Sequence, residues 1–179
     1  MAFQDYFAAI SSPALGVIAA HWDQARGERA MPAWEALRPS AIAGQLNMLW
    51  VFRYDADSEE FTGRLAGDRI ARGFERNFRG VPLKDLHPPQ YYPRIYEGMR
   101  NLARRPAMVH LKGKLFRQRD RVGMGERIVL PLSTDGIHCD GMLGASEYSF
   151  GVYDFSYGPV EILTGAEKYY PLGPPRAVA

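Results

Sequence analysis

The stretch from Phe61 to Leu86 places a strand, a very short helix and an apolar turn directly after one another. Side chains alternate with a period of two up to Gly67, which predicts a strand that this glycine ends. Asp68 suits the N-cap of the following helix, because its carboxylate can accept hydrogen bonds from the first backbone N–H groups. Ile70 and Phe74 lie four residues apart and therefore share one helix face. Several short elements across one face of a sheet would leave a pocket beneath them.

The first 27 residues are predicted to be helical. Ser12 suits an N-cap, and Pro13 suits the first helical position, where its missing N–H costs nothing. Apolar side chains then recur every four residues on one helix face, at Ala14, Ile18 and Trp22. This face is expected either to pack on a sheet of the same chain or to meet a second subunit, and the sequence favours neither alternative.

Five segments have the alternation or the apolar content of strands. Residues 46–55 are apolar on both faces, which is typical of a central strand covered on two sides. A helix is predicted from just after His87 to about Arg105, because apolar residues recur there at helical spacing. The charged residues 118–125 are expected to form a loop in solvent. The predicted strands are residues 46–55, 61–66, 107–117, 126–133 and 139–148.

Several short motifs accompany this order of elements. They are Met31-Pro32, Arg38-Pro39, Arg64-Leu65-Ala66-Gly67, Phe78-Arg79-Gly80, Leu83, Leu86 and Leu130-Pro131-Leu132-Ser133. With the strand of residues 46–54, they resemble the PAS domain, and in particular a short single-domain PAS family of bacteria. The resemblance covers residues 22–148. It implies an α+β fold, with a five-stranded antiparallel sheet, short helices and one long helix on one face, to which this chain adds an N-terminal helical extension.

The resemblance also divides the chain. We expect an N-terminal helical cap and loop over residues 1–38, a PAS-like domain over residues 39–149 and an irregular C-terminal tail over residues 150–179. The length of 179 residues is enough for one domain with appendages. The tail is rich in Tyr, Gly and Pro, and it is expected to pack partly through Tyr153, Phe155 and Tyr157.

The net charge of +2 conceals an asymmetry along the chain. Residues 64–127 contain 16 Lys or Arg against 6 Asp or Glu, and the remainder contains 6 against 14. A local basic excess attracts anions, acidic partners or nucleic acid. Here the basic residues are dispersed singly and no nucleic-acid-binding motif frames them, which argues against a nucleic-acid partner and favours a solvated basic face.

The N-terminal apolar run gives no sign of membrane insertion. Residues 6–22 carry no charge, but Ser, Pro and Gly interrupt the run and it is too short to span a bilayer. No basic residue precedes it, as one would in a signal peptide. The single cysteine, Cys139, has no partner for an internal disulfide, which suits a reducing compartment. We therefore expect a cytoplasmic protein.

Motifs of catalysis are missing from the sequence. Gly123-Met124-Gly125 precedes a strand and is therefore not a phosphate-binding loop. His138 and Cys139 are adjacent on a predicted strand, so they point to opposite faces and cannot easily act together as base and nucleophile. The four histidines show no metal-ligand spacing. These observations predict a protein that is not an enzyme and that has no metal site.

The resemblance to PAS domains implies a pocket between the sheet and the helices. The residues expected to bind a ligand there are Trp50, Leu65, Phe74, Phe78, His87, Tyr91, Met99, Met108, His110 and Met142. The alternative is that most of them form the hydrophobic core. Some PAS domains bind haem through a histidine, and His87 and His110 are the two candidates that this chain offers.

Three functions remain open at this point. The first is a stand-alone PAS-like regulatory domain that acts through contact with a protein partner, or with a second copy through the N-terminal helix, and is gated by a small ligand. The second is a sensor that carries haem or another cofactor. The third is a small cup-shaped α+β enzyme, which would need a buried carboxylate with a raised pKa facing the cavity.

Overall fold

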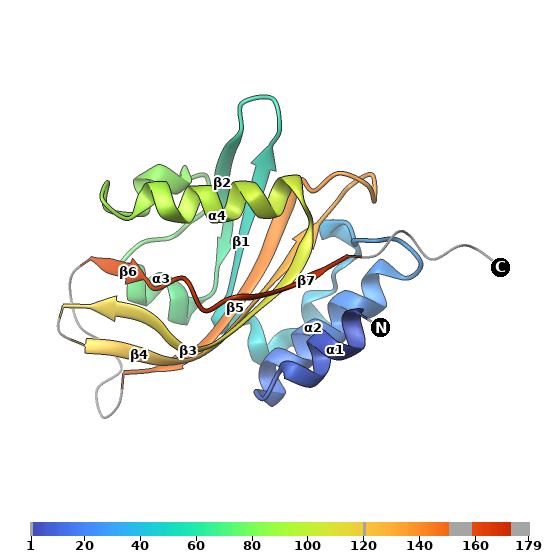
Figure 1. The fold of residues 1–179 in the computed structure, drawn as a ribbon, viewed down its shortest axis with the longest axis horizontal. Coiled ribbons are helices and arrows are strands. Elements are labelled where there is room, and N and C mark those ends of the chain that lie inside the picture. Colours follow the sequence, from blue (N-terminus) through green and yellow to red (C-terminus); the bar gives the residue numbers. More distant parts are fainter. Residues whose placement is uncertain (1, 120, 151–158, 173–179) are drawn as a thin grey trace.

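One antiparallel sheet forms the centre of the structure (Figure 1). The computed structural model describes residues 2–119, 121–150 and 159–172. Within them the strands follow the order β2-β1-β5-β4-β3-β6, and β7 also pairs with β3. The strands are β1 Leu49–Asp55, β2 Glu60–Ala66, β3 Ala107–Gln118, β4 Arg121–Leu132, β5 Gly141–Ser149, β6 Val160–Ile162 and β7 Lys168–Pro171.

Helices cover the sheet on both sides, and because the sheet is antiparallel the fold is α+β. The N-terminal helices α1 and α2 lie below the strands in Figure 1, and α4 lies above them. Among the described helices, none combines the length and the apolar character needed to cross a membrane. The α-helices are α1 Ala2–Ala9, α2 Pro13–Arg26, α3 Asp68–Phe74 and α4 Tyr92–Arg104, and the 3₁₀ helices are η1 Trp34–Ala36, η2 Pro39–Met48 and η3 Leu83–Asp85.

The N-terminal helices pack on the sheet of their own chain. The predicted cap at Ser12 is confirmed, because the backbone N–H of Leu15 donates to the Ser12 hydroxyl over 3.1 Å. Ile18 and Trp22 are buried side chains of α2. The Trp22 indole N–H donates to the carbonyl of Pro131 at the end of β4, over 2.9 Å. The apolar face of α2 is therefore used within the chain.

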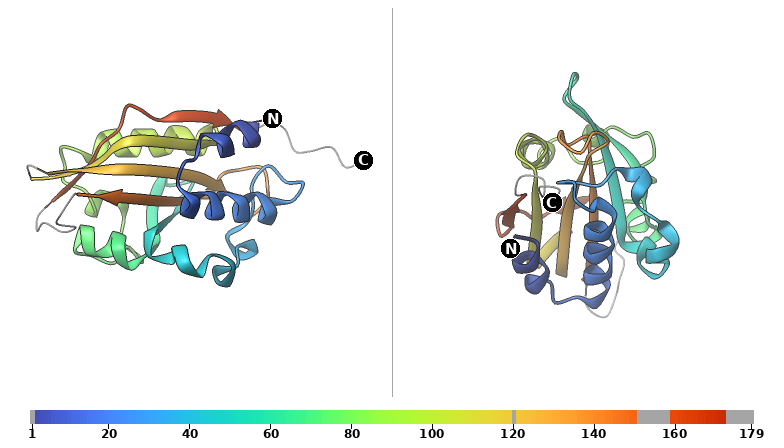
Figure 2. Two further views of the ribbon diagram at one scale, coloured as in Figure 1. Left: turned by 90° about the horizontal axis from the view of Figure 1, so that it is seen from below. Right: turned by 90° about the vertical axis from the view of Figure 1, so that its right-hand side faces the viewer.

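The prediction of five strands is incomplete, because the sheet has seven strands within the described residues. The two additional strands, β6 and β7, fall in the segment predicted to be an irregular tail. Both pair with β3 along its free edge (Figure 2, left). An unpaired edge exposes a row of N–H and C=O groups, and these two short strands cover it. The predicted contacts of Tyr153, Phe155 and Tyr157 lie outside the described residues.

Two local predictions also need correction. Asp68 is the first residue of α3, and Gly67 holds the N-cap position, so the Asp68 carboxylate lies in the first turn instead. Negative charge in the first turn still stabilises a helix, because it lies near the positive end of the helix dipole. The predicted loop of residues 118–125 is largely strand, because the β3–β4 ladder continues as far as the pair Gln118 and Arg121.

Gly67 marks a close approach between the end of β2 and η2. A Cβ atom at this position would lie 2.0 Å from the carbonyl oxygen of Leu46 and 2.5 Å from the carbonyl carbon of Asn47. Both neighbours are backbone atoms, which cannot move aside as a flexible side chain can. Only glycine therefore fits where the strand turns into α3.

Gly67→Ala is expected to lower the free energy of unfolding by about 1–3 kcal/mol, because the added methyl group overpacks a rigid backbone contact. Gly44→Ala is the matched control, since a Cβ at Gly44 would meet no atom within 4 Å. Urea denaturation of both variants and the wild type measures the difference. Equal midpoints for the two variants would show that η2 moves away at little cost.

Candidate functional site

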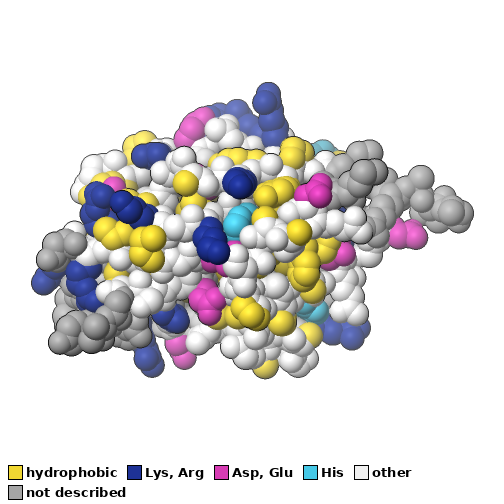
Figure 3. Space-filling view, turned by 60° about the horizontal axis from the view of Figure 1, so that its bottom comes forward, with side chains coloured by type: hydrophobic (Ala, Val, Ile, Leu, Met, Phe, Trp, Pro, Cys, Tyr) yellow, Lys and Arg dark blue, Asp and Glu magenta, His cyan; other side chains and the backbone are white. Residues whose placement is uncertain are grey.

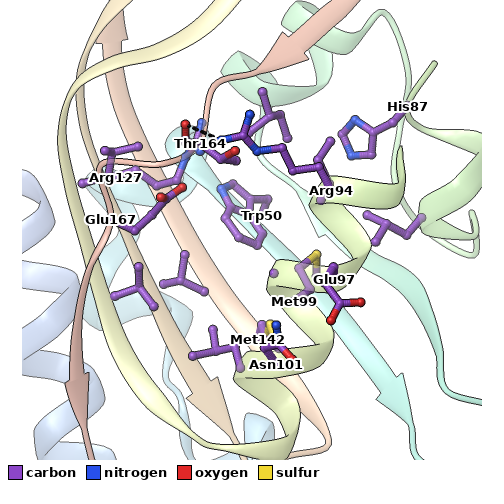
Figure 4. Close-up of a pocket in the computed structure, with 18 of the residues that line it drawn as sticks. Trp50, His87, Arg94, Glu97, Met99, Asn101, Arg127, Met142, Thr164 and Glu167 are labelled. Carbon is purple, nitrogen blue, oxygen red and sulfur yellow. Dashed lines mark hydrogen bonds between the residues drawn. The ribbon is translucent and has the colours of Figure 1, made fainter. Parts of the chain in front are cut away.

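A cavity of about 450 Å³ lies between the sheet, α3 and α4. Side chains from β1, β3, β4 and β5 form its floor, and the segment from β6 to β7 closes one side (Figure 4). Most of the lining is apolar, with several aromatic rings among it. Representative lining residues are Trp50, Phe74, Phe78, Ile95, Phe116 and Val129.

Six of the ten residues predicted to bind a ligand line this cavity: Trp50, Phe74, Phe78, His87, Met99 and Met142. The other four, Leu65, Tyr91, Met108 and His110, are outside its lining. Leu65 and Tyr91 are partly buried and pack against the core.

The direction of side chains along β3 explains why Met108 and His110 are outside the lining. Val109 and Leu111 line the cavity. Because successive side chains of a strand point to opposite faces, Met108 and His110 lie on the side of the sheet that faces the N-terminal helices.

Arg127 is one of the lining residues that the sequence did not single out. It is 8% exposed, and its guanidinium lies 4.7 Å from the centre of the Phe116 ring. Its Nε donates to the Ser146 hydroxyl over 3.2 Å, and its Nη2 donates to the Leu115 carbonyl over 3.2 Å. Burial lowers the pKa of Arg127 to about 10, partly offset by the Glu167 carboxylate, so the side chain remains a cation at neutral pH.

Trp50 and the segment from β6 to β7 complete this part of the wall. The Trp50 indole N–H donates to the same Ser146 hydroxyl over 3.3 Å, which places the ring beside Arg127. Thr164 and Glu167 also line the cavity, and the Thr164 hydroxyl is buried without a hydrogen-bond partner. Apolar residues at alternate positions, Val160 and Ile162, were the available sequence signal for this segment.

His87 lines the cavity from the loop before α4. The residue is 6% exposed, and its ring packs edge-on against Phe74 with 5.7 Å between the ring centres. Burial, and secondarily the charge of Arg127, lower its pKa to about 4, so the imidazole is neutral at physiological pH. Its Nδ1 is buried without a hydrogen-bond partner. Such a nitrogen is free to bind a ligand or to coordinate a metal that enters the cavity.

The opposite face of the same strands carries a buried polar network. The Glu126 carboxylate, in a residue 5% exposed, accepts the backbone N–H groups of Ser11 at 2.8 Å and of Ser12 at 2.7 Å. His110 Nε2 lies 2.6 Å from the same carboxylate. Burial raises the pKa of Glu126, but the hydrogen bonds from Ser11, His110 and Ser12 outweigh this effect and lower it overall. The network ties the start of α2 to the centre of β4.

The pair of His138 and Cys139 does not form a catalytic arrangement. Burial raises the pKa of the Cys139 thiol to about 11, so it stays protonated at neutral pH. The His138 ring instead lies 2.7 Å from the Asp135 carboxylate. Within the described residues there is no group of three His, Cys, Asp or Glu side chains that would hold a metal ion.

The sequence profile described as "PAS domain" matches residues 10–146 of this chain. The matched span begins just before α2 and ends within β5, so it includes both the cavity floor and the network around Glu126. No curated protein matches the chain.

Glu126→Gln is expected to destabilise the fold by about 1–3 kcal/mol at pH 7, because a neutral amide replaces a carboxylate that accepts three buried hydrogen bonds. The pKa of Glu126 is lower in the folded chain than its ordinary value of 4.5. Its contribution is therefore fully present above about pH 4.5 and is lost as the pH falls through the folded pKa.

The difference in stability between wild type and Glu126→Gln should thus shrink below about pH 4.5. Denaturant unfolding at a series of pH values measures it. Glu28→Gln is the control, since Glu28 is exposed and its replacement should change stability by less than about 0.5 kcal/mol. A difference from wild type that stays constant down to pH 3 would contradict the role assigned to the carboxylate.

Proposed function

Because the chain belongs to the PAS domain family, a family of sensory and regulatory domains, we propose that it detects a small molecule and reports it through protein contacts. The observation that carries this proposal is the cavity between α4 and the sheet. Its volume of about 450 Å³ falls in the range of roughly 300–1,000 Å³ usual for small-molecule sites. An apolar wall with a few polar groups that have no partner is typical of such a site.

The output is proposed to leave through the N-terminal helices. Arg127 on the cavity side and Glu126 on the helix side are neighbours in β4. A ligand that prefers one arrangement of β4 would therefore change how firmly Glu126 holds the start of α2. Phe7 of α1 and Val17 of α2 are 42% and 43% exposed, and they are available to a protein partner or to a second copy of the chain.

A haem-binding sensor is the second candidate, and the buried, neutral and unpartnered Nδ1 of His87 favours it. In that case the His87 imidazole would hold the haem, and haem would supply a redox or gas-binding response. The imidazole fits this role chemically. Purified protein would then absorb visible light, and His87→Ala would lose the absorption.

We propose no enzymatic role. Thr164 and Tyr169 carry the hydroxyls among the described cavity-lining residues, and the Thr164 oxygen has no hydrogen-bond partner within them, so no described base activates Thr164. Basic side chains on the face drawn in Figure 3 are interspersed with hydrophobic and acidic ones and form no single continuous patch. This distribution suits the proposal of a protein partner better than a nucleic-acid one.

Native mass spectrometry of freshly purified protein tests the proposal. Met99 points into the cavity (Figure 4), so the bulkier indole of Met99→Trp should obstruct it and reduce any non-covalently bound mass. Met124 is 51% exposed, and Met124→Trp is the matched control that should retain the bound mass. The same spectra report whether the chain is monomeric or dimeric.

Two results would count against a ligand-binding sensor. One is a wild-type spectrum that shows only the mass of the chain, both as purified and after incubation with a small-molecule extract of cells. The other is a bound mass that survives Met99→Trp unchanged.

A further inference from the structure

We propose that the cavity binds a monocarboxylic acid with an apolar body, and that the carboxylate of this ligand pairs with Arg127. The inference rests on the proposed function, because it names the chemical class of the ligand that the same cavity would take. Three observations carry it: the burial of a lone guanidinium, the charges around it, and two further polar groups without partners.

Arg127 is a buried cation that forms no ion pair with any residue the structure describes. Its two hydrogen bonds go to a hydroxyl and a backbone carbonyl, which are neutral acceptors. Among the described residues, no carboxylate forms a salt bridge with it. A buried charge is costly unless an opposite charge and hydrogen bonds compensate it. The planar fork of a guanidinium matches a carboxylate, which can accept two parallel hydrogen bonds from it.

The surrounding charges favour a ligand with a single negative charge. Glu167 also lines the cavity and acts on Arg127 electrostatically, although the two form no ion pair. The Glu167 carboxylate already accepts the backbone N–H of Gly165. Glu97 is a second carboxylate in the lining. A doubly charged phosphate would face both carboxylates with one buried cation to offset them, whereas a carboxylate brings one charge.

Arg94 is the second arginine in the lining, and its guanidinium lies at the exposed rim. Its Nη2 donates to the Thr164 carbonyl over 3.1 Å, at an exposed position. This contact joins α4 to the segment between β6 and β7, as the dashed line in Figure 4 shows. Arg94 therefore closes the rim, and Arg127 is the cation available inside.

Two buried side-chain atoms of the described lining residues have no partner and indicate where a ligand would be held. The Thr164 hydroxyl is drawn on the Arg127 side of Trp50 in Figure 4, where it can donate to the same carboxylate. His87 lies on the other side of Trp50 in that view, and its Nδ1 can meet a second polar group of the ligand. Between them the wall is aromatic and aliphatic, including Phe74 and Phe116, which suits an apolar body.

The test compares 4-phenylbutanoate with its neutral counterpart 4-phenylbutan-1-ol by isothermal titration calorimetry at pH 7. Wild type should bind the acid at least about tenfold more tightly than the alcohol, because a buried hydrogen bond to a charged group usually changes the affinity by this factor or more. Arg127→Met should bind both compounds equally. Arg94→Met is the matched control and should keep the preference for the acid. Circular dichroism verifies that each variant is folded.

Arg127→Lys keeps the charge but lacks the fork, so it should keep a reduced preference for the acid. If Arg127→Met does not fold, this variant and the wild-type comparison test whether the ligand carboxylate pairs with Arg127. Equal binding of acid and alcohol by wild type would overturn the carboxylate site and leave the cavity as a ligand site. A preference that persists in Arg127→Met, or disappears in Arg94→Met, would also overturn it. Binding of neither compound would contradict both the inference and the proposed function.

Discussion

Two buried charges in adjacent positions of β4 constrain the rest of this structure. Glu126 and Arg127 point to opposite faces of the sheet, because side chains alternate along a strand. Each face must therefore supply partners for a charge that water no longer solvates. On one face, the backbone N–H groups of Ser11 and Ser12 and the His110 ring meet the carboxylate. On the other, neutral acceptors and an aromatic ring surround the guanidinium beside a cavity.

This arrangement gives the fold a direct route between two surfaces. Arg127 lines the cavity, and Glu126 binds the start of α2. The two residues are consecutive in β4. The segment of β6 and β7 adds a wall to the cavity by pairing with the edge of β3. A ligand held at Arg127 would thus contact elements that are far apart in the sequence, and the position of β4 would carry its effect to α2.

The order of β1 to β5 and of the α-helices was predictable because period and caps are local properties of sequence, whereas β6 and β7 lie in the predicted tail. Side-chain direction along β3 was not, since Met108, Val109 and Leu111 are all apolar and either face of the strand could be the cavity side. A register shift between Lys114 and Phe116 then turns Phe116 into the cavity, where strict alternation would not place it. Arg127 was not predicted because a single arginine in a strand resembles one on a solvated face. Its burial depends on neighbours that only the folded chain brings to it, such as Phe116 and Ser146.

The most direct test of the coupling through β4 is hydrogen–deuterium exchange of the Ser11 and Ser12 amides, which donate to Glu126. Exchange is measured with and without saturating 4-phenylbutanoate, in wild type and in Glu126→Gln. The account predicts that the ligand slows exchange at these amides several-fold in wild type and has no effect in the variant. Exchange that is unchanged by the ligand in wild type, while cavity residues become protected, would contradict it.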